Sequence, residues 1–373
     1  MILKNCKVFL GDGEFHDCEL RFGKTIDGAG KFEGEGLDLG GAYVVPGYVD
    51  IHSHGCMNRD FSDGDPEAMA VASSYYAQNG VTSFLATTMT LKEHQLMPAM
   101  ACVKNAGALP GARCAGVNLE GPFLSYAKRG AQNPDNLHKP DADMFMRLHE
   151  ASGGAVKLVT VAPEEEGGLE FVKRVSPVCT VSVGHTEADY DTAMRAYEAG
   201  ASHATHLFNG MPGLHHRNPG VIGAAFDTGA TVELICDGMH IHPSAVRCAM
   251  QLFEGRLALI SDSLRCAGMP DGDYELGGLP IKLGGKVVKT HLFVRDAVEI
   301  LKDAAEWSYD SESQNAIASF EGGKVTISFG NQVFNESGWA KYQQLQKGAK
   351  GVKFDFNDFN DYDTFETYTI RAK

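Results

Sequence analysis

The sequence Tyr48-Val49-Asp50-Ile51-His52 is the first of eight short apolar runs that have the length of buried strands. Most of the intervals between these runs carry helix start and stop signals, such as Asp65-Pro66 before one helical segment and Asn79-Gly80 after it. The other seven runs are Thr82–Thr87, Cys114–Leu119, Val156–Val161, Val178–Val183, His203–Leu207, Thr231–Cys236 and Leu257–Ser261. Strands that alternate with helices in this way predict an α/β fold, a (β/α)8 TIM-like barrel. A doubly wound open sheet is the alternative, although it usually needs fewer strands.

The segments on either side of the predicted barrel have a different pattern. Residues 1–45 are short β-like runs broken by glycines, and they predict the N-terminal part of a small accessory β-domain. The barrel is expected over residues 46–306, with His291–Glu306 as its last covering helix. Residues 307–373 form a divergent tail whose strand-like runs are expected to extend or flank the N-terminal sheet, the alternative being a fused segment. Those runs are Lys324–Phe329, Gly351–Phe356 and Thr364–Ile370.

The composition is that of a globular protein, with 43% apolar and 22% charged residues in a chain of 373. The net charge of −15, from 33 basic and 48 acidic residues, argues against nucleic acid or an anionic membrane as a partner. An anionic small molecule stays open as a substrate, because a site can be locally basic. The chain has no run of about 18 apolar residues, so no membrane span is expected. No secretion signal is recognisable at the N-terminus, and nine scattered cysteines favour free thiols in a cytoplasmic protein.

Polar residues with metal-binding chemistry stand at the carboxyl ends of the predicted strands. His52 and His54 have the i, i+2 spacing that turns both imidazoles the same way in an extended chain. Taken singly, each such residue has an ordinary explanation, for example a chance His-x-His match, a buried core histidine or a helix cap. Barrel active sites are built from these strand ends, however, and imidazole with carboxylate suits Zn²⁺, Fe²⁺, Mn²⁺ or Co²⁺. The joint pattern therefore predicts a metal site from His52, His54, Glu120, His185 and His206, with Asp262 at the same end of the barrel.

Several of these residues lie in longer motifs that resemble a known family. The motif at residues 46–55, which contains the His-x-His pair, resembles the opening motif of the amidohydrolase superfamily. Four further elements resemble one branch of it, the N-acetylglucosamine-6-phosphate deacetylases. They are Leu119–Phe123, Gly184–Thr186, Thr205–Met211 and Ser261-Asp262. The Leu-Glu-Gly-Pro and Thr-His-Leu-Phe-Asn elements are specific to that branch, whereas His-x-His is not. The resemblance runs from residue 1 to near residue 285 and leaves the tail unmatched.

The resemblance implies metal-dependent hydrolysis of the acetamide of N-acetylglucosamine 6-phosphate, giving glucosamine 6-phosphate and acetate in amino-sugar catabolism. It implies one or two divalent ions, zinc before iron, manganese or cobalt, and a homodimer that acts on a phosphorylated amino sugar. Glu120, His185 and His206 match the metal ligands of the family. His52 and His54 match a pair that some members use for a second ion, which Glu120 would then bridge.

The resemblance also assigns roles around the metal. Asp262 matches the general base and acid, and His240 matches the residue that polarises the acetamide carbonyl. Arg217 matches an arginine that reaches the phosphate across a dimer interface. Asn209 and Gly210 match contacts on the phosphate side of the substrate.

The residues also supply the needs of amide hydrolysis without the resemblance: a metal to activate water, a carboxylate to move the proton and a donor for the oxyanion. One departure from the family is Gln132, which stands where a histidine usually contributes to the sugar pocket. The alternatives are another hydrolase or deaminase of the superfamily and a non-catalytic relative. The unmatched tail favours the non-catalytic relative, and the presence of Asp262 argues against it.

Overall fold

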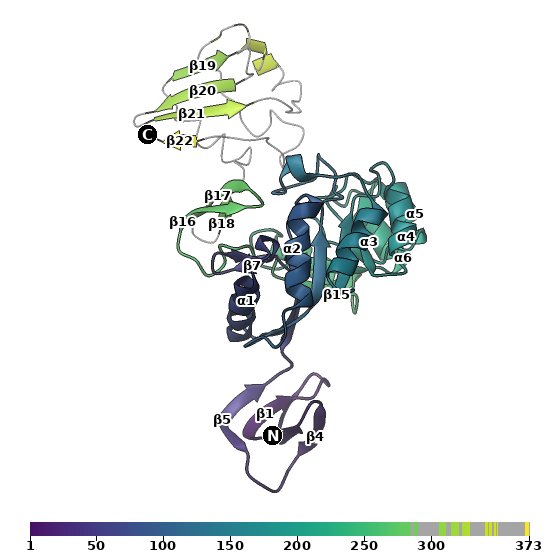
Figure 1. Ribbon diagram of the computed structural model, residues 1–373, viewed down its shortest axis with the longest axis vertical. Coiled ribbons are helices and arrows are strands. Elements are labelled where there is room, and N and C mark those ends of the chain that lie inside the picture. Colours follow the sequence, from purple (N-terminus) through teal and green to yellow (C-terminus); the bar gives the residue numbers. More distant parts are fainter. Residues whose placement is uncertain are drawn as a thin grey trace.

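The computed structural model describes residues 1–284, 287–289, 306–310, 315–320, 323–328 and 370–372, with scattered positions between 340 and 349. All eight predicted runs are strands of one parallel sheet, which confirms the (β/α)8 barrel (Figure 1). In chain order they are β6 (Tyr48–Ser53), β9 (Val81–Thr88), β10 (Arg113–Glu120), β11 (Val156–Val161), β12 (Thr180–Val183), β13 (His203–Ala204), β14 (Thr231–Ile235) and β15 (Leu257–Ile260). Each strand pairs with the next in this order, as successive crossover connections of one hand require.

The first and last strands of the sheet meet at its carboxyl end. The backbone N–H of Asp262, just after β15, donates to the carbonyl oxygen of His52 in β6 at 2.9 Å. The N–H of His54 donates to the carbonyl oxygen of Ser263 at 2.8 Å, and Ser53 forms a parallel bridge with Ser263. These bonds bring side chains from the two ends of the barrel sequence to the same edge.

Each of the first seven barrel strands is followed by a helix. The helices are α1 (Pro66–Gln78), α2 (Glu93–Lys104), α3 (Ala142–Ala151), α4 (Gly168–Val175), α5 (Tyr190–Glu198), α6 (Gly220–Thr228) and α7 (Pro243–Leu252). Helix α1 begins where the sequence predicts, because the Asp65 carboxylate accepts a hydrogen bond from the N–H of Glu67 at 2.9 Å. Two short 3-10 helices, η1 (Phe61–Asp63) and η2 (Pro134–Asn136), lie in connections. No helix in the described ranges is both long and apolar enough to cross a membrane.

The barrel strands present apolar side chains to the helices and polar ones to the barrel interior. Val181 and Val183 belong to the main core with the helices, so the alternation along β12 turns Ser182 inward. The Ser182 hydroxyl lies 2.6 Å from the hydroxyl of Thr205, which lies 2.9 Å from that of Thr160. The same alternation turns other polar residues inward at the carboxyl end, where the candidate site is built.

The N-terminal residues form a small sheet of their own, as predicted. Its strands are β1 (Ile2–Phe9), β2 (Phe15–Asp17), β3 (Glu19–Phe22), β4 (Ile26–Gly30) and β5 (Leu37–Val44). The order is β2-β1-β3-β4 with antiparallel pairs, and β5 joins β1 in parallel. Cys6, Val8 and Leu20 make its core, which is separate from that of the barrel.

Two smaller sheets lie near the barrel and were not predicted. The hairpin β7 (Gly55–Cys56) and β8 (Arg59–Asp60) follows the His-x-His pair. An antiparallel sheet of β16 (Gly272–Leu276), β17 (Leu279–Gly284) and β18 (Val287–Lys289) follows the eighth barrel strand. Leu276 and Ile281 of this sheet pack with Met89 from the loop after β9. The sheet therefore lies against the carboxyl end of the barrel.

The predictions for the tail have mixed outcomes. The helix expected at 291–306 lies outside the described residues, except for Glu306, which begins β19 (Glu306–Asp310). The run predicted at 324–329 matches β21 (Gly323–Ser328), the run at 351–356 lies outside the described residues, and of 364–370 only Ile370 is described, at the start of β22 (Ile370–Ala372). With β20 (Asn315–Phe320), these strands form one sheet in the order β19-β20-β21-β22.

The expectation that the tail strands extend the N-terminal sheet is wrong for the strands described. β21 pairs with β20 and β22, and the two sheets lie at opposite ends of the molecule (Figure 1). The physical reason is local: β19, β20 and β21 are joined by short connections, and consecutive strands pair with one another more readily than with distant ones. The domain limits at residues 45 and 306 stay predictions.

Candidate metal centre

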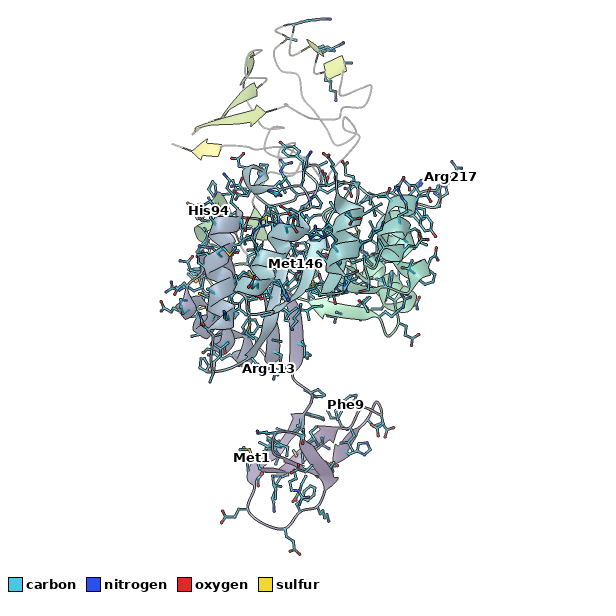
Figure 2. The ribbon with its side chains drawn as sticks, turned by 45° about the vertical axis from the view of Figure 1, so that its right-hand side comes forward. Met1, Phe9, His94, Arg113, Met146 and Arg217 are labelled. Carbon is cyan, nitrogen blue, oxygen red and sulfur yellow. The ribbon has the colours of Figure 1, made fainter. Side chains whose placement is uncertain are left out.

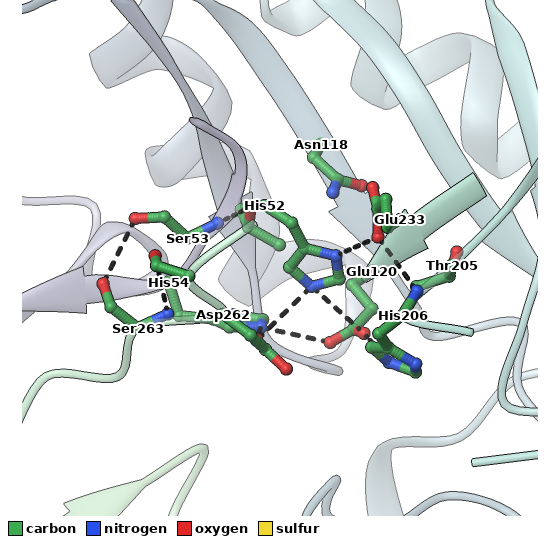
Figure 3. Close-up of polar contacts among 12 residues, drawn as sticks. His52, Ser53, His54, Asn118, Glu120, Thr205, His206, Glu233, Asp262 and Ser263 are labelled. Atoms are coloured by element: carbon green, nitrogen blue, oxygen red, sulfur yellow. Dashed lines mark hydrogen bonds and ion pairs between the residues drawn. The ribbon is translucent and has the colours of Figure 1, made fainter. Parts of the chain in front are cut away.

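The predicted metal-binding residues lie together at the carboxyl end of the barrel strands (Figure 3). His52 is the last residue but one of β6, and Glu120 is the last residue of β10. His185, His206 and Asp262 each stand two residues after a strand. These last three have positive φ values of 47°, 24° and 48°. The left-handed region is unfavourable for residues with a Cβ, and such strain is typical of functional sites. The chain thus turns sharply at each strand end and directs a polar side chain into the mouth of the barrel.

The first ligand group consists of Glu120, His185 and His206. Glu120 Oε1 lies 3.1 Å from His185 Nε2 and 2.9 Å from His206 Nε2, and the two Nε2 atoms lie 3.0 Å apart. Ligands at about 2.05 Å from a tetrahedral zinc ion are about 3.3 Å from one another. The three atoms therefore have nearly the spacing of three corners around one ion.

The second ligand group consists of His52, His54 and the same glutamate. His52 Nε2 lies 3.2 Å from Glu120 Oε1, and His54 Nε2 lies 3.1 Å from Glu120 Oε2. Asp262 Oδ1 lies 3.5 Å from His52 Nε2 and 3.3 Å from His54 Nε2. Glu120 belongs to both groups, so its carboxylate is the ligand that the two groups share.

Hydrogen bonds orient the imidazoles toward Glu120. His185 Nδ1 lies 2.7 Å from the carbonyl oxygen of Lys128, and His206 Nδ1 lies 3.1 Å from that of Asn209. A carbonyl oxygen can only accept, so both histidines carry a proton on Nδ1. In the neutral form this leaves the Nε2 lone pair for a metal, which is the arrangement that outer hydrogen bonds impose on metal-binding histidines.

The electrostatics of the cluster also fit a divalent cation. Burial raises the pKa of Glu120, but the imidazoles of His52 and His185 lower it well below the usual range of a glutamate. Burial lowers the pKa of His54, but its hydrogen bonds with Asp262 and Glu120 raise it to about 9. His52 Nε2 is buried and makes no well-formed hydrogen bond. The carboxylates thus stabilise positive charge on the ring nitrogens. A metal ion can supply this charge in place of the bound protons, so the residues present fit a divalent ion.

The predicted substrate-side residues differ in how close they lie to the cluster. Gln132 donates from Nε2 to Glu120 Oε2 at 2.6 Å and accepts from the N–H of Thr90 at 2.7 Å, so it lies in the site. Asn209 touches His206 through its carbonyl, and a Cβ at Gly210 would lie 3.0 Å from His185 Nδ1. Both therefore border the ligand histidines.

His240 and Arg217 are not brought to the cluster. His240 is exposed in the loop after β14, where its Nδ1 donates to Asp237 Oδ2 at 2.7 Å. Arg217 is exposed in the loop before α6, at the edge of the molecule (Figure 2), and its N–H donates to His215 Nδ1 at 3.3 Å. Within the described part of the chain, neither side chain contacts a predicted metal ligand.

Glu233, a wholly buried carboxylate in the middle of β14, belongs to the site but was not predicted from the sequence. Its Oε2 accepts from His52 Nδ1 at 2.8 Å and from the backbone N–H of His206 at 3.1 Å. The sequence does contain one indication, a glutamate inside the apolar run Thr231–Ile235. A charged residue is almost never fully buried without a partner, so its position predicts a buried polar contact.

Comparisons with known proteins agree with this geometry. The model of the amidohydrolase family matches residues 43–269, more than half of the chain, and this range contains the whole cluster. The chain is 39% identical over 252 residues to the N-acetylglucosamine-6-phosphate deacetylase of Bacillus subtilis, an overlap of 65% of this chain and 63% of that protein. It is 36% identical over 252 residues to the N-acetylgalactosamine-6-phosphate deacetylase of Escherichia coli O157:H7, covering 66% and 67% of the two chains.

A solved structure shares the fold. It is a mutant of N-acetyl-D-glucosamine-6-phosphate deacetylase from Mycobacterium smegmatis in complex with N-acetyl-D-glucosamine-6-phosphate, with 33% identity, a TM-score of 0.71 and 77% of each chain covered. The chain spans less than two thirds of the length of the Bacillus subtilis protein. The chain belongs to the amidohydrolase family, because the family model matches it and its barrel carries the expected histidines and glutamate at the strand ends.

Proposed function

We propose that this protein hydrolyses the acetamide of N-acetylglucosamine 6-phosphate to glucosamine 6-phosphate and acetate, in amino-sugar catabolism in the cytoplasm. The observation that carries the proposal is the carboxylate of Glu120 shared by two ligand groups, with Asp262 within 3.5 Å of both His52 and His54. The relatives from Bacillus subtilis and Mycobacterium smegmatis bear the name of this activity.

Glu120, His185 and His206 would hold one divalent ion, and His52, His54 and Glu120 would hold a second. Imidazole and carboxylate favour zinc, with iron, manganese or cobalt as alternatives. When bound, such an ion supplies the Lewis acidity that activates water and polarises the amide carbonyl near neutral pH.

Asp262 would move the proton. Burial raises the pKa of this carboxyl, but the imidazoles of His52 and His54 bring it below its usual range. The group is therefore a carboxylate at neutral pH, able to take the proton of the attacking water. The same carboxyl can then return that proton to the nitrogen of the leaving amine.

The remaining residues would bind the substrate. Gln132, beside Glu120, would line the sugar pocket, and Asn209 and Gly210 would contact the phosphate side. His240 would polarise the acetamide carbonyl by donating from Nε2, which requires the doubly protonated imidazolium because Nδ1 donates to Asp237. Arg217 would reach the phosphate of a neighbouring subunit in a homodimer, which accounts for its exposed position in a single chain.

The galactosamine epimer is a second candidate substrate, because the Escherichia coli relative is named for it at a similar identity. The test is acetate release from both epimers and from N-acetylglucosamine without phosphate, with metal-loaded protein. We expect turnover of N-acetylglucosamine 6-phosphate to be the most efficient. Acetate release from neither phosphorylated sugar would refute a deacetylase and favour a different hydrolase or a non-catalytic relative.

Arg217→Ala tests the phosphate contact. We expect KM for the phosphorylated substrate to rise roughly 10-fold or more, because a hydrogen bond to a charged group contributes about 1.5–3 kcal/mol. KM for N-acetylglucosamine should stay unchanged. Arg195→Ala, in which an exposed arginine of α5 is removed, is the matched control. Equal effects of Arg217→Ala on both substrates would show that this side chain does not recognise phosphate.

His52→Ala tests the second ion position. We expect the bound metal, measured by elemental analysis, to fall by one ion per chain, because the ligand group of Glu120, His185 and His206 stays complete. His94→Ala, with an exposed histidine of α2 removed, should keep the native metal content. Unchanged metal content in the His52 variant would remove this residue from the ligand set.

A further inference from the structure

We infer that Glu233 is the positioning residue that aligns the two ligand groups, by holding His52 and the backbone of His206 on one carboxylate oxygen. The inference deepens the proposed function and rests on its metal centre. Glu233 is the third residue of β14 and is wholly buried. Its neighbours Val232 and Leu234 belong to the core shared with the helices, so Glu233 faces the barrel interior.

One oxygen of Glu233 contacts a member of each ligand group (Figure 3). Oε2 accepts from His52 Nδ1 at 2.8 Å and from the backbone N–H of His206 at 3.1 Å. His52 belongs to the group with His54, and His206 to the group with His185. The carboxylate therefore fixes the distance between the groups, which must match the span of the shared Glu120.

The contact also decides which nitrogen of His52 faces the metal position. A carboxylate can only accept, so the Nδ1 of His52 carries the proton and Nε2 is left toward Glu120, 3.2 Å away. A carboxylate on the far nitrogen also makes an imidazole a stronger ligand. Without Glu233, His52 could rotate or adopt the other tautomer, and the site would lose a correctly oriented donor.

A second imidazole lies on the other side of Glu233. His203, the first residue of β13, places Nε2 3.3 Å from Glu233 Oε1. The Nδ1 of His203 lies 2.6 Å from the hydroxyl of Thr231. Thr231, His203, Glu233 and His52 thus form a continuous line of polar contacts inside the barrel. An imidazole thus lies beside each oxygen of the carboxylate, hydrogen-bonded in the case of His52 and as a looser ion-pair contact in the case of His203.

The competing explanation is purely structural: Glu233 could serve only as a buried counter-charge that stabilises the barrel. That role would make a substitution lower the stability of the metal-free protein and weaken both ions alike. A positioning role makes the loss larger for the ion at His52 and His54, because Glu233 holds the side chain of His52 but only the backbone of His206. The two explanations therefore differ in the pattern of metal binding.

The experiment is a titration of metal-free protein with Co²⁺, followed by visible absorption and calorimetry so that the two ions are resolved. We expect Glu233→Gln to weaken the ion at His52 and His54 by roughly 10- to 100-fold, the usual effect of removing an outer partner of a ligand. The ion at Glu120, His185 and His206 should weaken less. Ser182→Ala, which removes another buried polar group of the interior, should bind both ions as the native protein does.

Two further variants keep the test decisive. His203→Ala leaves every ligand and Glu233 in place but frees the carboxylate, so it should weaken the same ion in the same direction, and it decides the matter if Glu233→Gln does not fold. In a His52→Ala background, Glu233→Gln should change the affinity of the remaining ion less than it changes that of the His52 ion in the native background.

Native affinities in both Glu233→Gln and His203→Ala, or equal weakening of both ions, would overturn the positioning role. Native protein that binds one ion only, at His185 and His206, would also overturn it, since no ion at His52 would need to be positioned. Native protein that binds no Co²⁺ would refute the proposed metal centre itself. The native titration thus separates failure of the proposed function from failure of the inference.

Discussion

Replacing His206 with alanine should remove the metal ion held by Glu120, His185 and His206 and abolish measurable acetate release. His206 Nε2 lies 2.9 Å from Glu120 Oε1 and 3.0 Å from His185 Nε2, so its loss leaves two donors at that position. Two donors do not retain a divalent ion at the affinity of a complete site, and without the ion nothing activates water. His185→Ala should behave in the same way. Elemental analysis and an acetate assay on the same sample measure both effects.

The control for these variants must separate loss of a ligand from loss of fold. Far-UV circular dichroism should show the native helix content, because the core around α3 and α4 is apolar and contains none of the predicted ligands. His94→Ala, at an exposed position of α2, should keep both metal and activity. A His206→Ala protein that keeps the native metal content and rate would exclude His206 as a ligand.

Asp262→Asn should lower kcat by at least about 10²-fold while the metal stays bound, the usual contribution of a general acid–base group. Asparagine keeps the size and the polar contacts of the side chain but cannot take a proton from water. The backbone bond from residue 262 to the carbonyl of His52 is retained, so the barrel closure is preserved. The measurement is kcat for N-acetylglucosamine 6-phosphate at full metal loading.

An aspartate away from the site provides the matched control. Asp191, exposed in the first turn of α5, can be changed to asparagine without touching the cluster. That variant should keep the native kcat. An Asp262→Asn rate close to the native one would remove Asp262 from the mechanism and leave the proton transfer to another group.

The barrel and the metal ligands could be predicted because their signals are local. Each buried strand is a short apolar run, and each ligand stands at or just after the end of one. The His52 and His54 spacing follows from the alternation of side chains in an extended chain. Since parallel strands bring their carboxyl ends to one edge, local positions were enough to predict which residues meet.

Glu233 could not be predicted in the same way. The sequence shows one polar residue within an apolar run, but no neighbouring residue indicates which side chain it contacts. Its partners His52 and His203 lie on other strands, and the contact with His52 spans 181 positions of the chain. The pairing depends on which strands adjoin inside the barrel and on the inward turn of each side chain, which only the folded chain shows.

The tail and the substrate-side residues show two other limits. The sequence pattern from residue 324 onward predicts strands but not the strands with which they pair. In the structure β21 pairs with the adjacent β20 and not with the N-terminal sheet. Arg217 and His240 are exposed, and in the described chain they contact His215 and Asp237, not a predicted metal ligand. Their proposed roles depend on a second subunit and on a bound substrate, and neither belongs to the information in one sequence.

The proposed hydrolysis depends on metal held by two ligand groups that share Glu120. The most direct test is to strip the native protein of metal with a chelator, add Zn²⁺ stepwise, and measure bound metal and acetate release from N-acetylglucosamine 6-phosphate in each sample. We expect no activity without metal and a rate that rises in step with occupancy up to at most two ions per chain. Full activity in the metal-free protein would contradict it.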